Sequence, residues 1–270
     1  MKLLFSEYKS DYTNYIFPYA IWAIPEPHET PAMIFTKGFL PSSPEFERFY
    51  LCRQVRIDLN CFELSSENRR IVRKSENMEF RLIPRSQFEY TKKWRKFCKT
   101  YADIKFGKDV MTYERLDSLF NSKIVSHLLV FTDTKTKKDV GIVTLYLEKK
   151  SLAYYYYSFY NLNYYVHNLG MFLMTTAVDY FSGSDFSHIY LGTCYSRNSL
   201  YKTQFKGAEF FNGFQWSNNL KELKYLIERD KGAVNKHLIE TKTYQLEFYE
   251  DDLGKIIDTN GFPVILEPPR

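Results

Sequence analysis

YYYYSFY (Tyr154–Tyr160) stands before HNLGMFLMTTAVDYF (His167–Phe181) and HIYLG (His188–Gly192), and this order decides the fold. The aromatic run is typical of a buried strand. The second segment has the apolar spacing of a helix entered through a single glycine, and the third is a short apolar strand. A polar loop, TCYSRNSLYKTQFKGAEFFNGFQW (Thr193–Trp216), follows. Because α/β enzymes form pockets where adjacent strands end, we expect any reactive site within residues 154–216.

Two further strand-like runs precede this stretch. KIVSHLLVFTD (Lys123–Asp133) and VGIVTLYLEKK (Val140–Lys150) lead into SLAYYYYSFY (Ser151–Tyr160), and this succession predicts an antiparallel meander. Three antiparallel strands, a helix and a further strand make up the core of the acetyltransferase-like (GNAT) fold. We therefore predict the α+β class, with a GNAT-like (acyl-CoA N-acyltransferase-like) mixed sheet flanked by helices and a second, smaller N-terminal α/β lobe.

The N-terminal half mixes irregular and periodic segments. Residues 16–33 contain four prolines, which predict an irregular, packed segment. FYLCRQVRIDLN (Phe49–Asn60) alternates as one half-buried strand with Arg56 on its polar face. Residues 65–80 begin with a serine that can cap a helix, and they carry a cluster of cations. That cluster is either a solvated helix face or a phosphate-binding site.

The other segments complete the predicted organisation. Ile83–Gly107 has the pattern of an amphipathic helix with a basic outer face, and Asp109–Ser122 that of a second helix. Residues 218–232 predict a further helix, and residues 243–270 predict two extended segments. We divide the chain into an N-terminal lobe (1–82), a GNAT-like transferase domain (83–240) and an extended C-terminal tail that packs on the core (241–270).

Composition narrows the class of protein. The net charge is +5, which allows a phosphate-bearing partner but does not demand one. No apolar run of bilayer-spanning length occurs and the N-terminus lacks a signal-peptide core, so we expect a cytoplasmic protein with no membrane partner. The four cysteines are far apart, without a CxxC pair, so we expect free thiols and no metal.

The helix entry argues against the usual cofactor of the GNAT fold. That fold grips the pyrophosphate of coenzyme A with a Q/R-x-x-G-x-G/A loop, whose glycines let backbone N–H groups approach the phosphates. The equivalent loop, His167–Phe172, has one glycine, Gly170. Ordinary acyl-CoA binding is therefore disfavoured.

Several short motifs resemble the arginyl-tRNA–protein transferases. The C-terminal half of that family carries FYD, S-L-G, Y-L-G and Y-K-x-Q-F/Y motifs in this order. The matching positions here are Phe159-Tyr160-Asn161, Leu169-Gly170, Tyr190-Leu191-Gly192 and Tyr201-Lys202-Thr203-Gln204-Phe205. Upstream, the similar segments are Cys52–Ile57, Asn68–Glu79, Phe17–Tyr19 and Gly38–Ser43. The resemblance covers most of residues 15–230.

The chain also departs from the family's pattern. Of the N-terminal cysteine cluster that binds zinc or an iron–sulfur cluster in the family, only Cys52 is present. Leu40 and Pro41 stand where the family's G-F-R-R-S motif has two arginines. These departures put the ligand of those arginines, and arginine as the donated residue, in doubt.

The resemblance implies an aminoacyl-tRNA–protein transferase. Such an enzyme moves arginine or a leucine-class residue from the acceptor end of a charged tRNA to the N-terminal amine of a protein or peptide that begins with an acidic residue. The tagged protein then carries an N-degron. Aminoacyl-tRNA is the co-substrate, and no other cofactor is implied. The aminoacyl ester is already activated, so the protein mainly positions the reactants and moves a proton.

The implied roles fall on the following residues. Lys202 pairs with a terminal tRNA phosphate or an acidic acceptor residue; otherwise it is a surface lysine. Tyr201 and Gln204 contact the terminal adenosine or the aminoacyl group. The full set of predicted catalytic residues is Tyr195, Tyr201, Lys202 and Gln204, and the predicted substrate-binding residues are Arg56, Arg69, Arg70, Tyr157, Tyr160, Asn168, Gly170 and Gly192. For the tyrosines the alternative is core packing, and for Arg69 and Arg70 it is an exposed helix face.

Two other functions stay open. One is an acyl-CoA N-acyltransferase that has lost the usual loop. The other is a relative that binds tRNA or N-terminal degrons without transferring anything, which the missing cysteines and arginines favour.

Overall fold

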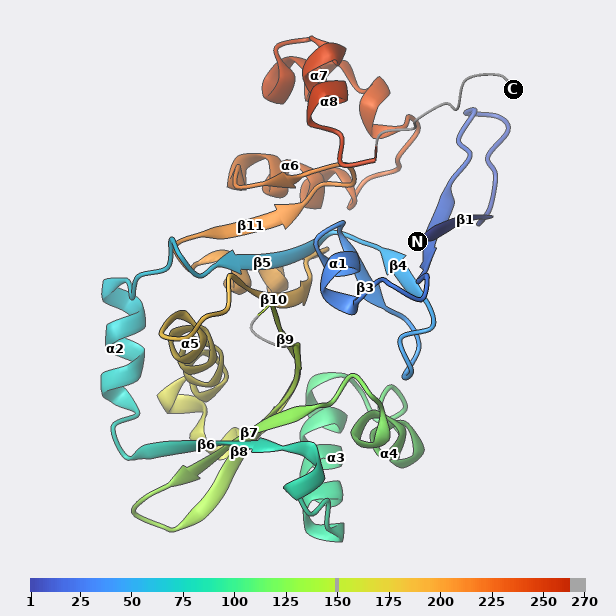
Figure 1. The fold of residues 1–270 in the computed structure, drawn as a ribbon. Coiled ribbons are helices and arrows are strands. Elements are labelled where there is room, and N and C mark those ends of the chain that lie inside the picture. Colours follow the sequence, from blue (N-terminus) through green and yellow to red (C-terminus); the bar gives the residue numbers. More distant parts are fainter. Residues whose placement is uncertain (149–150, 263–270) are drawn as a thin grey trace.

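The computed structural model describes residues 1–148 and 151–262, which form an eight-stranded mixed sheet and a four-stranded antiparallel sheet beside it (Figure 1). The strand order of the large sheet is β12-β11-β5-β10-β9-β8-β7-β6, and that of the small sheet is β1-β2-β4-β3. The predicted fold class, an α+β fold with a mixed sheet flanked by helices and a small N-terminal unit, is confirmed.

The centre of the large sheet has the order predicted from the sequence. Its elements are β7 (His127–Asp133), β8 (Lys138–Glu148), β9 (Leu152–Tyr160), α5 (Leu169–Ser182) and β10 (His188–Thr193). The first three strands pair antiparallel, and α5 crosses over so that β10 runs parallel to β9. The last two residues of the predicted middle strand, 149–150, lie outside the described residues.

Helices cover both faces of this sheet. Helix α5 is buried along most of its length and packs with α2 (Ser66–Lys74) on one face. Helices α3 (Lys92–Lys105) and α4 (Tyr113–Asn121) pack on the other face. An all-round apolar helix such as α5 is stable only when enclosed, which explains its place between the sheet and α2.

The predicted single strand Phe49–Asn60 is wrong in one respect. It consists of two strands, β4 (Phe49–Leu51) in the small sheet and β5 (Gln54–Asp58) in the large sheet. The side-chain alternation continues through both, so the pattern could not reveal that the chain changes sheets. Strand β6 (Met78–Pro84) was not predicted, and it forms an edge of the large sheet. The predicted boundary between residues 82 and 83 falls within it.

The expectation of an irregular segment near the N-terminus is also wrong. Residues 1–32 include β1 (Lys2–Glu7) and β2 (Tyr19–Ile24), which form a hairpin, and the start of α1 (Pro31–Phe35). The prolines stand at the ends of these elements rather than inside them, where the lack of an N–H group does little harm. The short β3 (Phe39–Pro41) completes the small sheet.

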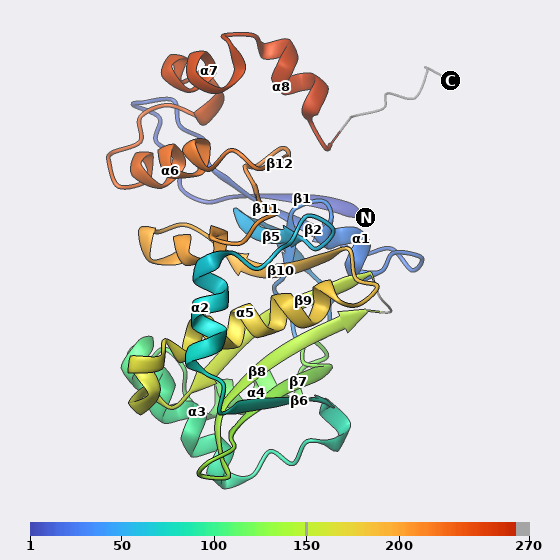
Figure 2. The same cartoon turned by 90° about the vertical axis from the view of Figure 1, so that its left-hand side faces the viewer.

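The C-terminal region is helical, which corrects the predicted extended tail. After β11 (Ala208–Phe211) and β12 (Trp216–Ser217), the predicted helix is present as α6 (Leu220–Arg229), capped by Asn219. It is followed by α7 (Lys242–Tyr249) and α8 (Leu253–Thr259), which lie beyond α6 at the end of the molecule opposite β6 (Figure 2).

Long-range contacts stabilise these last helices, so a local pattern did not reveal them. The Glu222 carboxylate on α6 accepts hydrogen bonds from the Tyr244 and Tyr249 hydroxyls of α7. The rest of the predicted second segment, residues 263–270, lies outside the described residues. No helix of the described part of the chain has both the length and the apolar character needed to cross a bilayer.

Candidate functional site

Strands β9 and β10 separate part-way along their length, and the site lies at this divergence. They pair only at Ile189 with Ala153 and at Tyr190 with Tyr154. The register of β10 then shifts between Tyr190 and Gly192, and β10 continues as a partner of β5 alone. The rest of β9, from Tyr155 onward, therefore has no partner on its β10 side, as expected where an extra residue bends a strand away from its neighbour.

A second irregularity lies in β9. Leu145 of β8 pairs with Tyr155, while the preceding Thr144 pairs with Tyr157, so Tyr156 is an extra residue in the ladder. The buried Thr144 hydroxyl accepts a hydrogen bond from the Tyr157 N–H at 3.0 Å and donates one to its carbonyl at 3.3 Å. Because of this bulge, Tyr156 and Tyr157 line the same cavity, although strand neighbours normally face opposite sides.

The first cavity, on the α5 side of β9, has a volume of about 330 Å³. Its lining residues come from α3, β9, the start of α5 and the 3-10 segment Arg197–Thr203: Tyr101, Tyr155, Ser158, Tyr160, Asn168, Gly170, Met171, Met174 and Tyr201. The structure thus brings together four of the predicted site residues, Tyr160, Asn168, Gly170 and Tyr201.

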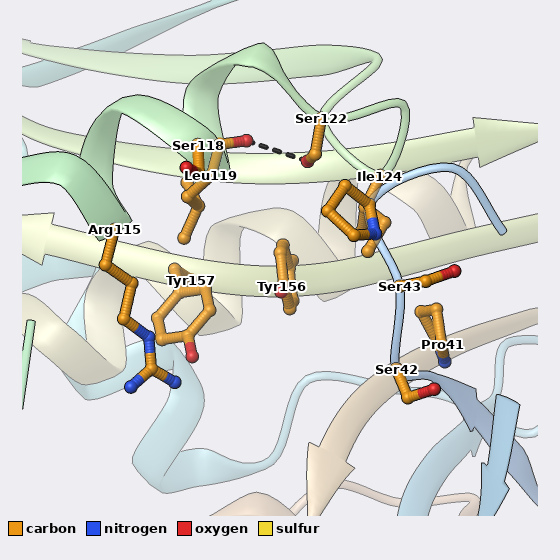
Figure 3. A pocket seen from close by; sticks show the side chains of 11 residues that line it. Pro41, Ser42, Ser43, Arg115, Ser118, Leu119, Ser122, Ile124, Tyr156 and Tyr157 are labelled. Carbon is orange, nitrogen blue, oxygen red and sulfur yellow. Dashed lines mark hydrogen bonds between the residues drawn. The ribbon is translucent and has the colours of Figure 1, made fainter. Parts of the chain in front are cut away.

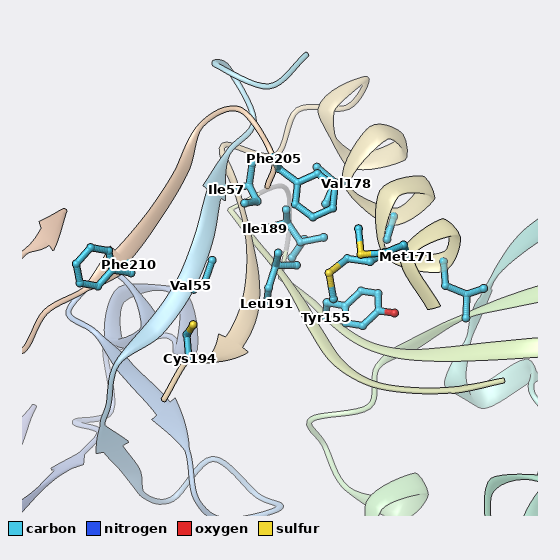
Figure 4. Close-up of a cluster of buried hydrophobic side chains, with 14 of the residues drawn as sticks. Val55, Ile57, Tyr155, Met171, Val178, Ile189, Leu191, Cys194, Phe205 and Phe210 are labelled. Atoms are coloured by element: carbon cyan, nitrogen blue, oxygen red, sulfur yellow. The ribbon is translucent and has the colours of Figure 1, made fainter. Parts of the chain in front are cut away.

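The polar groups of this cavity are not all satisfied by the protein. Tyr155 is 4% exposed, its side chain points toward α5 (Figure 4), and its hydroxyl has no hydrogen-bond partner, although the Ser158 hydroxyl lies beside it. Burial raises the pKa of Tyr155, so it stays a neutral donor. Asn168, the N-cap residue of helix α5, is left-handed with φ 51°, and its side chain forms no capping hydrogen bond. A ligand in this cavity would therefore meet an unpaired hydroxyl and an uncapped helix end.

Gly170 has a steric role in the same place. A Cβ atom at this position would lie 2.6 Å from the Tyr160 hydroxyl oxygen. The Tyr160 ring therefore fills the space directly above the first turn of α5. This arrangement leaves less room at the helix terminus than a pyrophosphate-gripping loop with several glycines provides.

Lys202 lies at the divergent end of β10. Its ammonium donates a hydrogen bond to the Thr193 carbonyl at 2.8 Å, and burial lowers the pKa of this lysine. Gly192, with φ 79°, adopts the left-handed backbone that the bulge requires. A Cβ there would lie 3.7 Å from the ammonium nitrogen. A cation held in a poorly solvated place with one protein acceptor is suited to meet a negative charge on a ligand.

Buried thiols surround this lysine without offering a nucleophile. Cys52 and Cys194 are 5% and 0% exposed, respectively. Burial raises the pKa of Cys52 to about 12, so its thiol is neutral near pH 7. The Gln54 side chain, in register with Thr193, is fully buried, and neither its amide nitrogen nor its oxygen has a partner.

The other predicted catalytic residues lie around the same segment. Tyr195 is 50% exposed, and its hydroxyl accepts a hydrogen bond from the Arg53 N–H at 2.7 Å. The Gln204 amide donates to the Met171 sulfur at 3.0 Å, which connects the loop to the first turn of α5. Tyr201 is 43% exposed at the mouth of the first cavity.

The second cavity lies on the α4 side of β9 and has a volume of about 180 Å³ (Figure 3). It is lined by Pro41, Ser42, Ser43, Pro44, Arg115, Ser118, Leu119, Ser122, Ile124, Tyr156 and Tyr157. No carboxylate is among these residues. The Arg115 guanidinium donates to the Val110 carbonyl at 3.0 Å, has no carboxylate partner in the described part of the chain, and extends toward Tyr157 (Figure 3). This cavity therefore combines one cation with hydroxyls and an apolar floor.

Three predicted arginines do not reach either cavity. Arg56 forms an ion pair with Glu209, with 2.7 Å between Nε and Oε2, and its guanidinium lies 3.9 Å from the centre of the Trp216 ring. On the outer face of α2, Arg70 pairs with Glu67, and Arg69 donates to the Leu64 carbonyl. The sequence could not reveal the partner of Arg56, because Glu209 is 153 positions away. The partners of Arg69 and Arg70 are local, in line with the exposed helix face given as the alternative for these two residues.

Sequence reasoning missed several residues that line the cavities. Ser42 and Ser43 fall in the Gly38–Ser43 motif, so the resemblance contained a signal for them. Tyr155 belongs to the quoted aromatic run, but only the bulge determines which of its tyrosines face which side. For Arg115 we find no signal, since it reads as one more charge on an amphipathic helix.

One group of described residues has donor atoms close enough to hold a cation: Glu26, His28 and Glu29. The N-terminal ammonium pairs with both of these carboxylates. The group lies in the small sheet region and lines neither cavity.

No protein-family model matches the chain, and no curated protein matches it in sequence. Among solved structures it is similar to L-PGS from Bacillus licheniformis (12% identity, TM-score 0.42, covering 53% of this chain and 46% of that chain). It is also similar to FemX (9% identity, TM-score 0.39, covering 53% of this chain and 52% of that chain). A third similar structure is a GCN5-related glucosamine N-acetyltransferase region of a fungal multi-domain GH3 beta-N-acetylglucosaminidase. It has 12% identity and a TM-score of 0.39, and the match covers 70% of this chain and 23% of that chain. The chain spans about half the length of the first two structures. Likenesses this distant carry no information on substrate, so the resemblance to the arginyl-tRNA–protein transferases stays a prediction.

Proposed function

We propose that this protein is an aminoacyltransferase that passes an amino acid from aminoacyl-tRNA to the N-terminal amine of a protein or peptide. The observation that carries the proposal is the arrangement of two cavities on the two faces of β9, beside the divergence from β10 where the Lys202 ammonium lies. Two separate cavities on the two sides of one strand suit a reaction with two substrates, and the Lys202 ammonium, which lines neither cavity, lies at the end of the neighbouring strand. The resemblance of the sequence motifs to the arginyl-tRNA–protein transferases supports aminoacyl-tRNA as the donor.

In this proposal the first cavity holds the aminoacylated end of the tRNA. The terminal adenine stacks on exposed or partly exposed aromatic rings, for which Tyr201 and Tyr160 are placed at the cavity. The unpaired Tyr155 hydroxyl donates a hydrogen bond to the aminoacyl ester or to the ribose. Asn168 and Gly170, at the uncapped start of α5, provide further donors.

The second cavity holds the acceptor. Arg115 forms a charge-assisted hydrogen bond with an acidic first side chain of the acceptor, and the serine and tyrosine hydroxyls accept from its α-amine. This assignment replaces Arg56, Arg69 and Arg70, whose guanidinium groups are engaged with Glu209, the Leu64 carbonyl and Glu67.

The chemistry requires positioning and one proton transfer. The neutral α-amine attacks the ester carbon, the new C–N bond forms, and the bond from that carbon to the tRNA 3′-oxygen breaks. One proton passes from the amine to the departing oxygen, so that an amide and a free 3′-hydroxyl result. The Lys202 ammonium stabilises the negative charge that develops on the oxygen. No protein nucleophile is needed, which agrees with the neutral state of Cys52.

One assay tests donor and acceptor together. The full chain is incubated with a labelled mixture of aminoacyl-tRNAs and with peptides that begin with Asp, Glu, Lys or Arg, and the peptides are analysed by mass spectrometry. A mass increase of one amino acid on the Asp and Glu peptides supports the proposal. Binding of an Asp peptide without any product would favour a non-catalytic relative. Thermal stabilisation by acetyl-CoA but not by charged tRNA would favour an acyl-CoA enzyme.

A further inference from the structure

A groove runs from the first cavity along helix α3. It has a volume of about 380 Å³, and its walls are α3 and the chain segment 160–163. The lining residues are Lys93, Lys96, Phe97, Thr100, Tyr101, Ile104, Tyr160, Asn161, Leu162 and Asn163. Tyr101 and Tyr160 line both the groove and the first cavity, so the two form adjoining parts of one surface depression.

The α3 wall of the groove is one continuous helix face. Lys93, Phe97, Thr100 and Ile104 follow one another at intervals of three or four residues, with Lys96 beside Phe97. Such spacing places side chains in a row along one face. This face therefore presents a cation, an aromatic ring and a hydroxyl in succession toward the 160–163 segment.

The cations of α3 differ in how they are engaged. Arg95 pairs with Asp117 and Lys99 with Asp103, and both pairs lie away from the groove lining. Lys93 and Lys96 are exposed, and in the described part of the chain neither forms an ion pair. Asp139 adjoins Lys93, but its carboxylate accepts from the Thr132 hydroxyl and faces Arg81 at 3.8 Å. Two cations of α3 that carry no ion pair in the described part of the chain, Lys93 and Lys96, thus face the groove.

Aromatic rings lie between these charges and the first cavity. Phe97 is partly buried, Tyr101 is 8% exposed, and Tyr101 and Tyr160 have ring centres 4.7 Å apart. Proteins that bind single-stranded nucleic acid combine a positive groove, which follows the phosphates, with rings on which bases stack. A duplex offers no unstacked bases to such rings. The combination therefore favours a single strand over a helix.

We propose that this groove binds the single-stranded 3′ end of an RNA and guides it into the first cavity. Lys93 and Lys96 contact backbone phosphates, and Phe97 stacks on a base. The inference rests on the proposed function, because it gives the tRNA end a path to the reactive centre. It also accounts for cations on α3 that no protein carboxylate neutralises.

The test measures RNA binding without any transfer chemistry. The probe is an uncharged, fluorescently labelled RNA single strand ending in CCA, compared with a blunt duplex of the same length by fluorescence anisotropy. The test variant is Lys93→Ala/Lys96→Ala in the full chain. The matched control is Lys221→Ala/Lys224→Ala, because these lysines are also exposed and spaced by three on a helix, α6, away from the groove.

Loss of two phosphate contacts should weaken single-strand binding about 10- to 30-fold at about 0.1 M salt, and should lower the slope of log K against log salt by about 1.4. The control pair should bind within about twofold of the native chain. Phe97→Leu should weaken binding about fivefold or more without changing the salt slope.

Equal affinity of the test and control pairs, or equal affinity for strand and duplex, would overturn the inference. If the lysine-dependent binding is seen but no aminoacyl-tRNA yields a peptide product, the groove stands and the proposed transfer fails. If the product forms at an unchanged rate in Lys93→Ala/Lys96→Ala, the transfer stands and the groove assignment fails.

Discussion

Replacing Lys202 by methionine separates a chemical role of this lysine from a structural one. In the folded chain Lys202 is partly buried, and its ammonium forms one hydrogen bond, to the Thr193 carbonyl at 2.8 Å. Burial lowers the pKa of Lys202, so the surroundings disfavour the charged form relative to water. Methionine has a similar length, carries no charge and adapts to irregular spaces.

Two opposing effects determine the change in stability. Loss of the charge-assisted hydrogen bond costs about 1.5–3 kcal/mol, and removal of a poorly solvated charge offsets a comparable amount. We therefore expect the free energy of unfolding of Lys202→Met to differ by no more than about 1 kcal/mol, or about 2–4 °C in Tm. Removing a cation that stabilises charge on a departing oxygen should lower kcat about 100- to 1000-fold.

The assay combines thermal unfolding with single-turnover transfer from charged tRNA to a peptide. The matched control is Lys206→Met, since Lys206 is exposed on the same segment and pairs with Glu63 at 2.8 Å. This control should keep both Tm and kcat. Transfer by Lys202→Met within about threefold of the native rate would refute the chemical role. A fall in Tm of more than about 8 °C would show instead that the lysine supports the fold.

Four further outcomes follow from the structure. In a steady-state assay, Arg115→Met should raise the KM about 10- to 100-fold for peptides that begin with Asp or Glu, because one charge-assisted contact is lost. The KM for peptides that begin with Ala should stay unchanged. The Glu222 carboxylate is 2% exposed and accepts four hydrogen bonds. In urea unfolding, Glu222→Gln should therefore lower the free energy of unfolding by about 1–2 kcal/mol and Glu222→Ala by about 3–5 kcal/mol. Equal decreases for the two variants would contradict this account. Gly170→Ala should cost about 1 kcal/mol because its Cβ would meet the Tyr160 hydroxyl and ring. Tyr160→Phe in that background should recover only part of this loss, since the ring carbons Cζ and Cε1 would still lie 2.9 and 3.0 Å from the new Cβ. Burial, and then the charge of Arg56, lower the pKa of His188 in the folded chain. As the pH drops, the unfolded chain therefore binds this proton first, and the free energy of unfolding should fall below about pH 6.5. In His188→Asn the free energy of unfolding should depend less on pH in this range.

The centre of the fold could be predicted because its patterns are long and local. The meander β7–β8–β9, helix α5 and strand β10 each have a hydrophobic run that decides their type. Strand β6 and the β1–β2 hairpin were missed because their short runs stand beside prolines and charges. Helix α7 was mistaken for an extended segment because its tyrosines bond to Glu222, about 20 or more positions earlier in the chain, and α8 packs against α7.

The candidate site was predictable only where its residues are close in sequence. Tyr160, Gly170 and Tyr201 belong to motifs near the two diverging strands, and the fold brings them to one cavity. Arg115 lies on α4, and its place beside Tyr157 depends on how that helix packs against β9. Arg56 shows the opposite error. Its alternating position suggested a free cation, and only the pairing of β5 with β11 supplies Glu209 as its partner.

The divergence itself depends on backbone irregularities that hydrophobic periodicity does not report. A bulge in β9 makes Tyr156 and Tyr157 neighbours on the α4 side, and a bulge in β10 turns Thr193 and its lysine contact toward β5. Without the first, Tyr157 would face α5 and the second cavity would lose its ring beside Arg115. Without the second, β10 would continue along β9 and close the space that now separates them. The two cavities and the position of the cation at the end of β10 are therefore consequences of two extra residues, Tyr156 and Leu191, in otherwise regular ladders.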